Sequence, residues 1–260
     1  MIKAFELSFR SPVLFRRERT EYWKLPSDTI LRGLVATAIR LYQEEQITKL
    51  FNEIKNKRIA ASSLLLLKNN TVYYPNHGLK AYCTINQEDI IDASEITDTQ
   101  EMVRISRLEA YESTPFEYFA LRLEKYRGLI LLKFPDTLDE IITASIRLLG
   151  DLGIGGKRSR GYGKFNILKI KNIEDYGLTT STDGILVSRY IPEKAEYVKG
   201  QPIYVEDVII NFGNNILYKF SVIAEGSILN KADNGHVEYI KNDTGHLVPI
   251  IFTPLLIKLR

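Results

Sequence analysis

The sequence predicts an α+β fold with a ferredoxin-like first domain and a smaller β-rich second domain. Apolar spacing alternates between strand and helix periods in the order strand, helix, hairpin, strand, helix, strand, which is the βαββαβ order of a ferredoxin-like (RRM-like) unit. The composition turns polar after Ile170, and residues 184–260 carry strand patterns without a convincing helix. We therefore predict domains at 1–175 and 176–260, with a glycine-rich loop at 150–165 in the first.

The first domain opens with a predicted strand at residues 2–9 and a helix that starts after Pro26. Apolar residues at helical spacing define the buried face of this helix: Ile30, Leu31, Leu34, Val35, Ala38, Ile39 and Tyr42. Ser27 and Asp28 occupy positions where a helix needs N-cap oxygens. We therefore interpret Asp28 as a capping residue rather than a catalytic one.

A hairpin at residues 58–74 and an apolar strand at 128–134 continue the pattern. Thr137 and Glu140 then have the spacing of a capping box at the start of the second helix. Gly150 lies where a C′ glycine would end that helix.

Residues 76–101 interrupt the pattern with an inserted acidic segment. Its carboxylates are Glu88, Asp89, Asp92, Glu95, Asp98 and Glu101. The segment is too long for an ordinary connection between two elements. We expect a mobile acidic surface loop, and docking onto a basic patch of a partner is the alternative.

The stretch at 150–165 combines glycines with cations and aromatic residues. Its glycines are Gly150, Gly153, Gly155, Gly156, Gly161 and Gly163, and its cations are Lys157, Arg158, Arg160 and Lys164. Glycine permits positive φ and close approach of the backbone to a ligand. Cations neutralise phosphates, and an aromatic ring such as Tyr162 stacks on bases, so this composition predicts contact with nucleic acid. A flexible, solvated hairpin is the other interpretation.

The order of elements excludes the common nucleotide-binding loops. A P-loop lies between a strand and a helix N-terminus, whereas this loop follows a helix C-terminus, where the dipole is negative. Asp151 and Arg158 stand where a Walker motif around Lys157 needs Gly and Ser or Thr, and neither glycine cluster completes G-x-G-x-x-G. Residues 160–165 resemble the start of an RNP1 strand, but Lys164 departs from that motif, and the loop follows a helix instead of preceding one.

Composition bounds the function further. The 260 residues carry a net charge of +3 and have a pI near 8.7, so a nucleic-acid surface must be local. One cysteine, Cys83, excludes an intrachain disulfide and a cysteine-based zinc site. Neither a signal peptide nor an apolar run of about 18 residues occurs, so we expect a cytoplasmic protein without a membrane partner.

Catalytic groups are not evident in the sequence. The three histidines are His77, His236 and His246, and none has metal-ligand spacing or lies near the glycine loop in sequence. We expect a protein that is not an enzyme and that holds neither a metal nor a cofactor.

The helix followed by Gly-Asp-Leu-Gly-Ile-Gly-Gly-Lys-Arg-Ser-Arg-Gly-Tyr-Gly-Lys-Phe resembles the signature glycine loop of the CRISPR-associated RAMP superfamily. Its Gly-Gly-Lys-Arg-Ser-x-Gly-Tyr-Gly part is most similar to the fourth-subunit family of type III-A Csm effector complexes. The run ending at Tyr73-Tyr74-Pro75 and the Ile-x-Arg turn at Arg107 also resemble that family. The resemblance covers residues 1–170 well and the remainder weakly.

This resemblance implies two ferredoxin-like domains, the second degenerate and β-rich. It implies a non-catalytic subunit of antiviral defence that holds the 5′ repeat-derived handle of crRNA. The implied partners are crRNA, the large polymerase-like signature subunit and the backbone RAMP subunit. With the basic segment before the first helix, the expected RNA-binding residues are Gly153, Gly155, Gly156, Lys157, Arg158, Ser159, Arg160, Gly161, Tyr162, Gly163, Arg107, Arg16, Arg17 and Lys24.

Two other functions remain open. One is a metal-independent endoribonuclease that processes CRISPR repeat RNA, with His77 or Tyr162 in the reaction. RAMP nucleases of that kind typically carry a histidine around the first helix, and none is present here. The other is a purely structural assembly subunit. A solvated crossover loop is likewise the alternative role for Arg16, Arg17 and Lys24.

Overall fold

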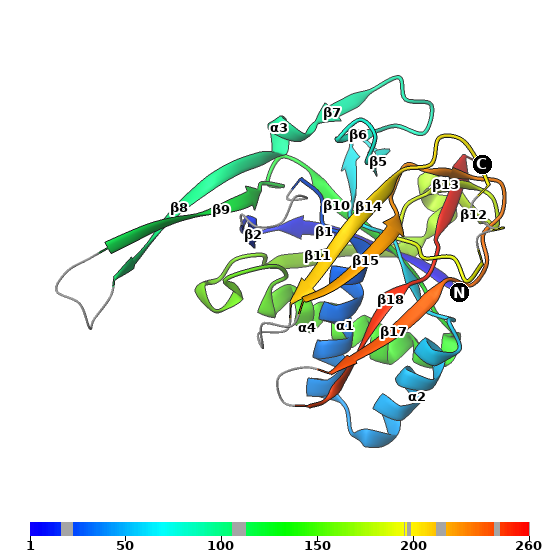
Figure 1. Ribbon diagram of the computed structural model, residues 1–260, viewed down its shortest axis with the longest axis horizontal. Helices are drawn as coiled ribbons and strands as arrows, with labels where there is room; N and C mark the ends of the chain where they lie inside the picture. The colour runs from blue at the N-terminus through cyan, green and yellow to red at the C-terminus, as the bar shows by residue number, and fades with distance from the viewer. Residues whose placement is uncertain are drawn as a thin grey trace.

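A large antiparallel sheet organises the molecule (Figure 1). The computed structural model describes residues 1–16, 23–105, 113–194, 196, 199–211, 217–241 and 245–259. The strands follow the spatial order β11-β1-β10-β4-β5-β6-β7, and the short β3 also pairs with β10. Their bounds are β1 Ile2–Phe9, β3 Ala60–Ala61, β4 Leu65–Lys68, β5 Thr71–Asn76, β6 Ala81–Cys83, β7 Ile90–Asp92, β10 Arg127–Lys133 and β11 Phe165–Asn172.

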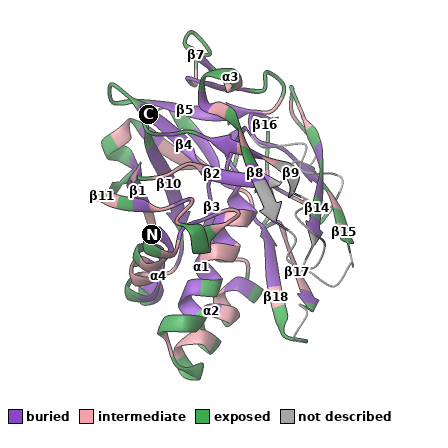
Figure 2. Ribbon diagram, turned by 90° about the vertical axis from the view of Figure 1, so that its left-hand side faces the viewer, coloured by how far each residue is buried: buried purple, intermediate pink, exposed green. Residues whose placement is uncertain are grey.

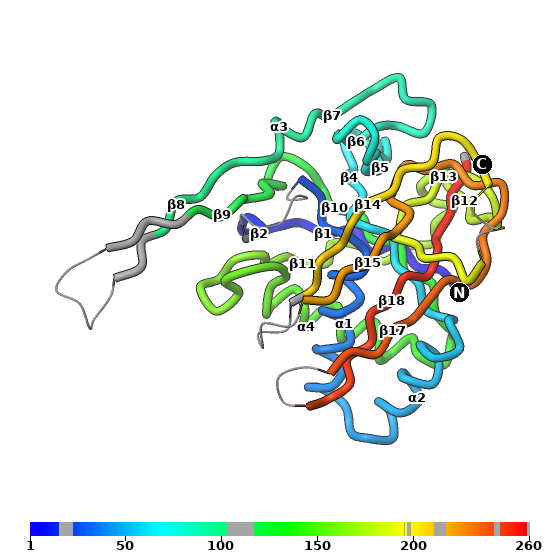
Figure 3. The backbone as a smooth tube through the Cα atoms, in the orientation of Figure 1, coloured from blue at the N-terminus to red at the C-terminus, as the bar shows by residue number. Residues whose placement is uncertain are grey.

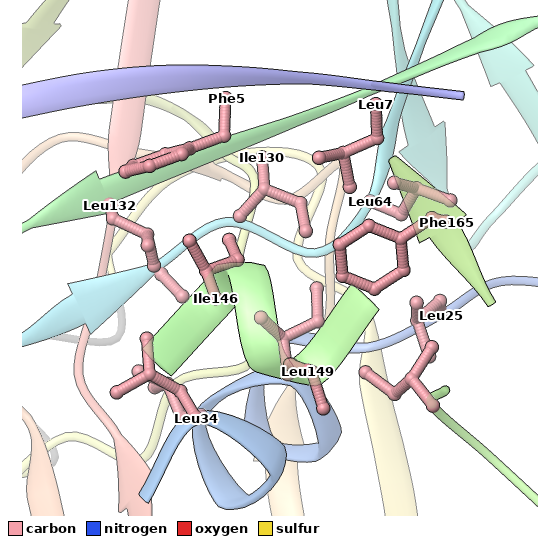
Figure 4. Packing of buried hydrophobic residues seen from close by; sticks show 14 of the residues in the cluster. Phe5, Leu7, Leu25, Leu34, Leu64, Ile130, Leu132, Ile146, Leu149 and Phe165 are labelled. Atoms are coloured by element: carbon pink, nitrogen blue, oxygen red, sulfur yellow. The ribbon is translucent and has the colours of Figure 1, made fainter. Parts of the chain in front are cut away.

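Helices α1 (Ser27–Leu41) and α4 (Asp139–Leu152) pack on one face of this sheet. Phe5 and Leu7 alternate along β1 and so point to the same face, where they meet Leu149 and its helical neighbours (Figure 4). Gly33 lets the two helices approach closely, because a Cβ there would lie 3.0 Å from a methyl carbon of Leu149. Helix α2 (Glu44–Lys55) lies further out and buries only part of its surface (Figure 2).

The opposite face of the sheet is covered by strands from the end of the chain. Ala4 and Leu131 belong to a buried cluster with Leu178, Ile185 and Ile257. These last residues come from β12 (Leu178–Ser181), β13 (Gly184–Leu186) and β19 (Leu256–Leu259), which pair with one another. Burial on both faces explains why β10 is an uninterrupted apolar run rather than an alternating one.

The remaining C-terminal strands form two hairpins that pack together. They are β14 (Val205–Asn211) with β15 (Leu217–Ile223), and β17 (His236–Lys241) with β18 (Leu247–Phe252). Val208, Val222 and Phe252 lie in the cluster between them. After the 3₁₀ turn at Ile173–Tyr176, the described residues contain strands, including β16 (Ile228–Leu229), and no α-helix. The β-rich character expected of the C-terminal part is confirmed.

A buried ionic cluster joins the two parts of the chain. The Lys24 ammonium lies 2.7 Å from Glu206 and 2.5 Å from Glu225, and all three side chains are almost fully enclosed. Arg189 pairs with Asp28 at 2.8 Å and also with Glu206. In three of these pairs the partners lie about 160 to 200 residues apart in sequence. Their opposite charges neutralise one another where water is excluded.

The helix termini differ from the expectation. Pro26 is the N-cap of α1, and neither Ser27 nor Asp28 caps the helix with its side chain. Ser27 instead accepts the backbone N–H of Arg189 at 2.9 Å, and Asp28 pairs with Arg32 at 2.9 Å in addition to Arg189. The predicted capping role of Asp28 is therefore wrong, and its carboxylate instead forms an ion pair that joins distant segments.

The capping box predicted at the start of α4 is also wrong. The chain enters α4 through a 3₁₀ turn at Asp136–Leu138, and Leu138 is the N-cap, with no side-chain capping bond. At the other end α4 continues through Gly150 to Leu152, and Gly153, with φ of +84°, ends it. Glycine is needed at position 150 for a packing reason, because the Phe165 carbonyl occupies the place where a side chain would be.

The predicted acidic loop is largely built into regular structure. Residues 81–83 and 90–92 form β6 and β7, followed by the short helix α3 (Ala93–Ile96). Asp92 and Glu95 make a reciprocal capping box on α3, and Asp89 accepts a hydrogen bond from Tyr73. The expectation of a loop is wrong for most of the segment, because β6, β7 and β8 pair with neighbouring strands, and residues 84–89 connect β6 to β7.

A second, three-stranded sheet stands beside the main one, in the order β2-β9-β8. Its strands are β2 (Val13–Arg16), β8 (Thr97–Ile105) and β9 (Ser113–Leu121). The hairpin of β8 and β9 projects from the body of the molecule (Figure 3). Among the helices of the described residues, none has both the length and the apolar character needed to cross a membrane.

Candidate nucleic-acid interface

The glycine loop begins with a narrow neck directly after α4. The Gly153 N–H donates to the Leu149 carbonyl at 2.8 Å, which completes the last helical turn. One residue later, the Ile154 N–H donates to the Gly163 carbonyl at 3.0 Å, so the outgoing and returning chains are tied together. Ile154 is buried in the main core and anchors the neck.

The turn after β1 and the start of β2 hold both sides of the loop. The Gly156 N–H donates to the Leu14 carbonyl at 2.7 Å, and the Gly163 N–H donates to the Pro12 carbonyl at 2.8 Å. The Arg10 N–H donates to the carbonyl of Lys164 at 2.8 Å. Backbone hydrogen bonds therefore attach the loop to β2 and to the turn that precedes it, so the loop is not a free hairpin in solvent.

Most of its glycines allow the chain to pack on itself. A side chain at Gly163 would overlap the carbonyl of Ile154, and one at Gly153 would overlap the carbonyl of Tyr162. A Cβ at Gly155 would lie 2.8 Å from a methyl carbon of Val13. Gly161, with φ of +88°, is the loop glycine whose Cβ would meet nothing within 4 Å. Gly153, Gly155 and Gly163 therefore serve internal packing of the loop, and their contact with RNA stays a prediction.

The tip of the loop carries its exposed cations. Arg158–Arg160 form a single 3₁₀ turn, which follows Lys157 in the left-handed region at φ of +54°. Arg158, Ser159 and Arg160 are all exposed. No ion pair to Arg158 or Arg160 occurs among the residues that the structure describes, so the turn presents positive charge to solvent.

Two side chains connect the loop to the base of the projecting hairpin. Lys157 places its ammonium 5.3 Å from the ring centroid of Tyr118 on β9, a cation–π distance. Arg160 Nη1 lies 4.0 Å from the sulfur of Met102 on β8. Tyr162 packs, half-buried, against the same cluster around Met102 and Tyr118. The loop and the hairpin base therefore form one surface, which we call the loop–hairpin surface.

One predicted RNA contact is wrong. Lys24 is enclosed by Glu206 and Glu225, and burial lowers its pKa to about 8. A lysine in a basic stretch of sequence predicts a surface residue, but the acidic partners of Lys24 come from β14 and from the segment after β15. Lys24 is therefore removed from the candidate interface.

The other predicted contacts outside the loop have different positions. Arg16 ends β2 and is in register with Tyr118 of β9, so its backbone lies on the same small sheet that borders the loop. Arg17 and Arg107 fall outside the described residues. The structure thus places Arg16, Lys157, Ser159 and Tyr162 within one neighbourhood.

Sequence reasoning missed the residues that shape this surface from other elements. Ser11, Pro12 and Leu14 hold the loop, and Met102 and Tyr118 support its tip. The Ser-Pro pair signals only a turn. The contacts of Met102 and Tyr118 depend on the pairing of β8 with β9 and of β9 with β2.

The histidine considered for catalysis lies elsewhere. His77 Nδ1 is 3.5 Å from a Glu206 carboxylate oxygen in the ionic cluster, and desolvation, followed by repulsion from Lys24, lowers its pKa to about 4. Within the described ranges, no group of three or more His, Cys, Asp or Glu residues has a metal-binding arrangement.

Known structures have the same fold. A chain of the crystal structure of a Csm3–Csm4 subcomplex from the type III-A CRISPR–Cas interference complex matches with a TM-score of 0.67 and 16% identity, over 100% of both chains. A Csm1–Csm4 cassette in complex with pppApA matches with a TM-score of 0.59 and 18% identity, over 100% of this chain and 98% of that one. The same cassette with AMPPNP gives 0.58 at 19% identity. Csm4 is the component common to these complexes.

Comparison of the sequence with protein families identifies the superfamily of the chain. No curated protein matches the chain. The model of the RAMP superfamily, however, matches residues 7–166, which include α1, α4, the glycine loop and the main-sheet strands from β3 to β10. The chain therefore belongs to the RAMP superfamily, and its fold is that of the type III-A Csm4 structures.

Proposed function

We propose that the protein is a non-catalytic RNA-binding subunit of a type III-A CRISPR Csm complex and holds the 5′ repeat-derived handle of crRNA. One observation carries the proposal: a 3₁₀ turn with Arg158, Ser159 and Arg160 exposed, without an acidic partner among the described residues, on a loop tied to the sheet. A cationic tip on a fixed base is well placed to bind a polyanion, because little conformational entropy is lost when its charges meet the phosphates.

The chemistry of the tip suits a ribose–phosphate backbone. The two guanidinium groups bind phosphates by charge-assisted, bidentate hydrogen bonds, and the Ser159 hydroxyl both donates and accepts. Tyr162 keeps part of its ring accessible beside Met102 and Tyr118, so one base can stack there. Each such stack contributes about 1–3 kcal/mol.

The remaining elements support the same role. The spatial order β11-β1-β10-β4, with α1 and α4 on one face, is the arrangement of a ferredoxin-like unit, and we assign the N-terminal part to that class. We propose a degenerate second unit from residue 176 on, which covers the other face of the sheet.

Assembly is the second part of the proposal. The structural relatives form a subcomplex with Csm3 and a cassette with Csm1. We propose that this chain likewise joins a backbone RAMP subunit to the large signature subunit. The projecting β8–β9 hairpin and the C-terminal hairpins supply surface for such contacts.

The test compares two double variants in the assembled complex. Arg158→Ala with Arg160→Ala removes the tip cations, and Arg58→Ala with Arg147→Ala removes two exposed arginines from other elements. The affinity for a labelled RNA carrying the 5′ handle is measured across salt concentrations. Loss of two phosphate contacts lowers the slope of log affinity against log salt by about 1.4, since each contact on a single strand contributes about 0.7. The control pair keeps the wild-type slope.

Two outcomes would overturn the proposal. Unchanged crRNA occupancy after alanine replacement of Lys157, Arg158, Arg160 and Lys164 would favour a purely structural subunit. Site-specific cleavage of repeat RNA in EDTA that is lost in His77→Gln or Tyr162→Phe would establish a metal-independent endoribonuclease instead.

A further inference from the structure

The turn that leads out of the cationic tip is held by one side chain from a different part of the chain. The Ser11 hydroxyl donates to the Gly161 carbonyl at 2.8 Å and accepts the Lys164 N–H at 3.0 Å. These two groups are the ends of the Gly161–Lys164 turn. Ser11 thus spans the turn with the donor and one of the two acceptor positions of its hydroxyl.

Packing does not hold Gly161. A Cβ there would meet no atom within 4 Å, and its own N–H is used inside the 3₁₀ turn, where it donates to the Arg158 carbonyl at 2.9 Å. Its φ of +88° is one that glycine adopts freely along with many others. Among the contacts of the described residues, the Ser11 hydrogen bond is what ties Gly161 to the body of the protein.

The neighbours of Ser11 fix the residues on either side. Arg10 and Pro12 bind Lys164 and Gly163 through backbone groups, and these contacts do not depend on the side chain at position 11. A change of the hydroxyl therefore leaves the neck in place and frees the end of the tip at Gly161.

We propose that Ser11 is a positioning residue of the RNA site: its hydroxyl sets the orientation of the Arg158–Arg160 turn without touching RNA itself. The proposal rests on the proposed RNA-binding function of this loop. When the hydroxyl is removed, the turn pivots about Gly161 and the two guanidinium groups no longer meet their phosphates together.

The test uses the full chain with Ser11→Ala, Ser11→Thr and a matched control, Ser94→Ala, which removes a hydroxyl of α3 that donates to Asp92, the N-cap residue of that helix. Affinity for the labelled handle RNA is measured against salt. Ser11→Ala is expected to weaken binding about fivefold and to lower the salt slope by about 0.7, one phosphate contact, although no charge is changed. Ser11→Thr, which keeps the hydroxyl, and Ser94→Ala are expected to behave as wild type.

Three results would overturn the positioning role. Weaker binding with an unchanged slope would mean that the hydroxyl contacts RNA directly. Wild-type binding by Ser11→Ala would mean that the turn is held without it. Failure of Ser11→Thr to restore binding would mean that side-chain volume, not the hydroxyl, matters.

A measurement without RNA separates this proposal from the function it rests on. Hydrogen exchange at the Lys164 amide is expected to accelerate at least tenfold in Ser11→Ala and to stay slow in Ser94→Ala. If exchange accelerates but the Arg158/Arg160 double variant binds RNA normally, the RNA-binding function is wrong and the Ser11 hydrogen bonds to the turn are confirmed. If the double variant loses binding and exchange is unchanged, only the positioning role of Ser11 is wrong. Should Ser11→Ala not fold, Ser11→Cys, whose thiol is a weak donor of similar size, takes its place.

Discussion

The Ile154 N–H donates to the Gly163 carbonyl at 3.0 Å, and the Ile154 carbonyl occupies the place of a side chain at Gly163. The two residues close the neck of the glycine loop through their backbones. Any side chain at position 163 must displace a main-chain atom that is itself anchored in the core.

Gly163→Ala is therefore expected to lower the free energy of unfolding by about 3 kcal/mol or more, through the overlap and the positive φ of +71°. Gly161→Ala shares the positive φ but has open space, so its expected loss is only about 1–2 kcal/mol. Urea unfolding of both variants measures the difference. Equal losses would mean that the neck is not closed in solution.

Gly150→Ala separates local propensity from tertiary packing. Alanine in a helix interior is favoured over glycine by about 1 kcal/mol, so α4 considered alone predicts a gain in stability. The Phe165 carbonyl fills the space of the new methyl group, so we expect a loss instead. Arg147→Ala, at an exposed position on the same helix, is expected to change the unfolding free energy by less than about 0.5 kcal/mol. A higher melting temperature for Gly150→Ala would contradict the packing of β11 against α4.

Lys24→Met is expected to destabilise the protein by about 3–5 kcal/mol, because Glu206 and Glu225 would keep buried charges without their ammonium. Lys219→Met is the control: its partner Asp207 is exposed, and such pairs contribute about 0–1 kcal/mol. Denaturant unfolding measures both losses. At a temperature where the Lys24 variant is folded, its affinity for handle RNA is expected to equal that of wild type. A stable variant with weakened RNA binding would restore Lys24 to the interface.

The ionic cluster also predicts sensitivity to acid. The pKa of His77 is lowered from 6.5 to about 4, by burial first and by the nearby Lys24 charge second. As the pH falls from 6.5 toward 4, the unfolded chain binds a proton that the folded protein does not, so stability declines over that window. His77→Gln removes this contribution, and its melting temperature is expected to fall less between pH 7.5 and pH 5 than that of wild type. His236→Gln, at the more exposed histidine of β17, serves as the control. An equal decline in wild type and His77→Gln would show that other groups of the cluster dominate.

The elements with strong periodicity could be predicted because their signals are local. The alternation of Phe5, Leu7 and Phe9 marks β1, and the apolar face from Ile30 to Ala38 marks α1, so both lie close to where the sequence puts them. The predictions are wrong mainly at the ends of the helices. Gly150 fits a C′ position by local rules, but α4 continues to Leu152. Glycine stands at position 150 because Phe165 of β11 occupies the space of a side chain there.

The sequence alone determined that the loop carries glycines and cations together, and it was sufficient to identify the RAMP superfamily. Only the tertiary structure decided which of these residues face solvent. Lys24 is enclosed because Glu206 and Glu225 reach it from strands that follow far along the chain, and Gly161 is held because Ser11 reaches it from the turn after β1. The physical reason is that burial of a charge and anchoring of a turn depend on partners brought together by folding, which local spacing does not encode.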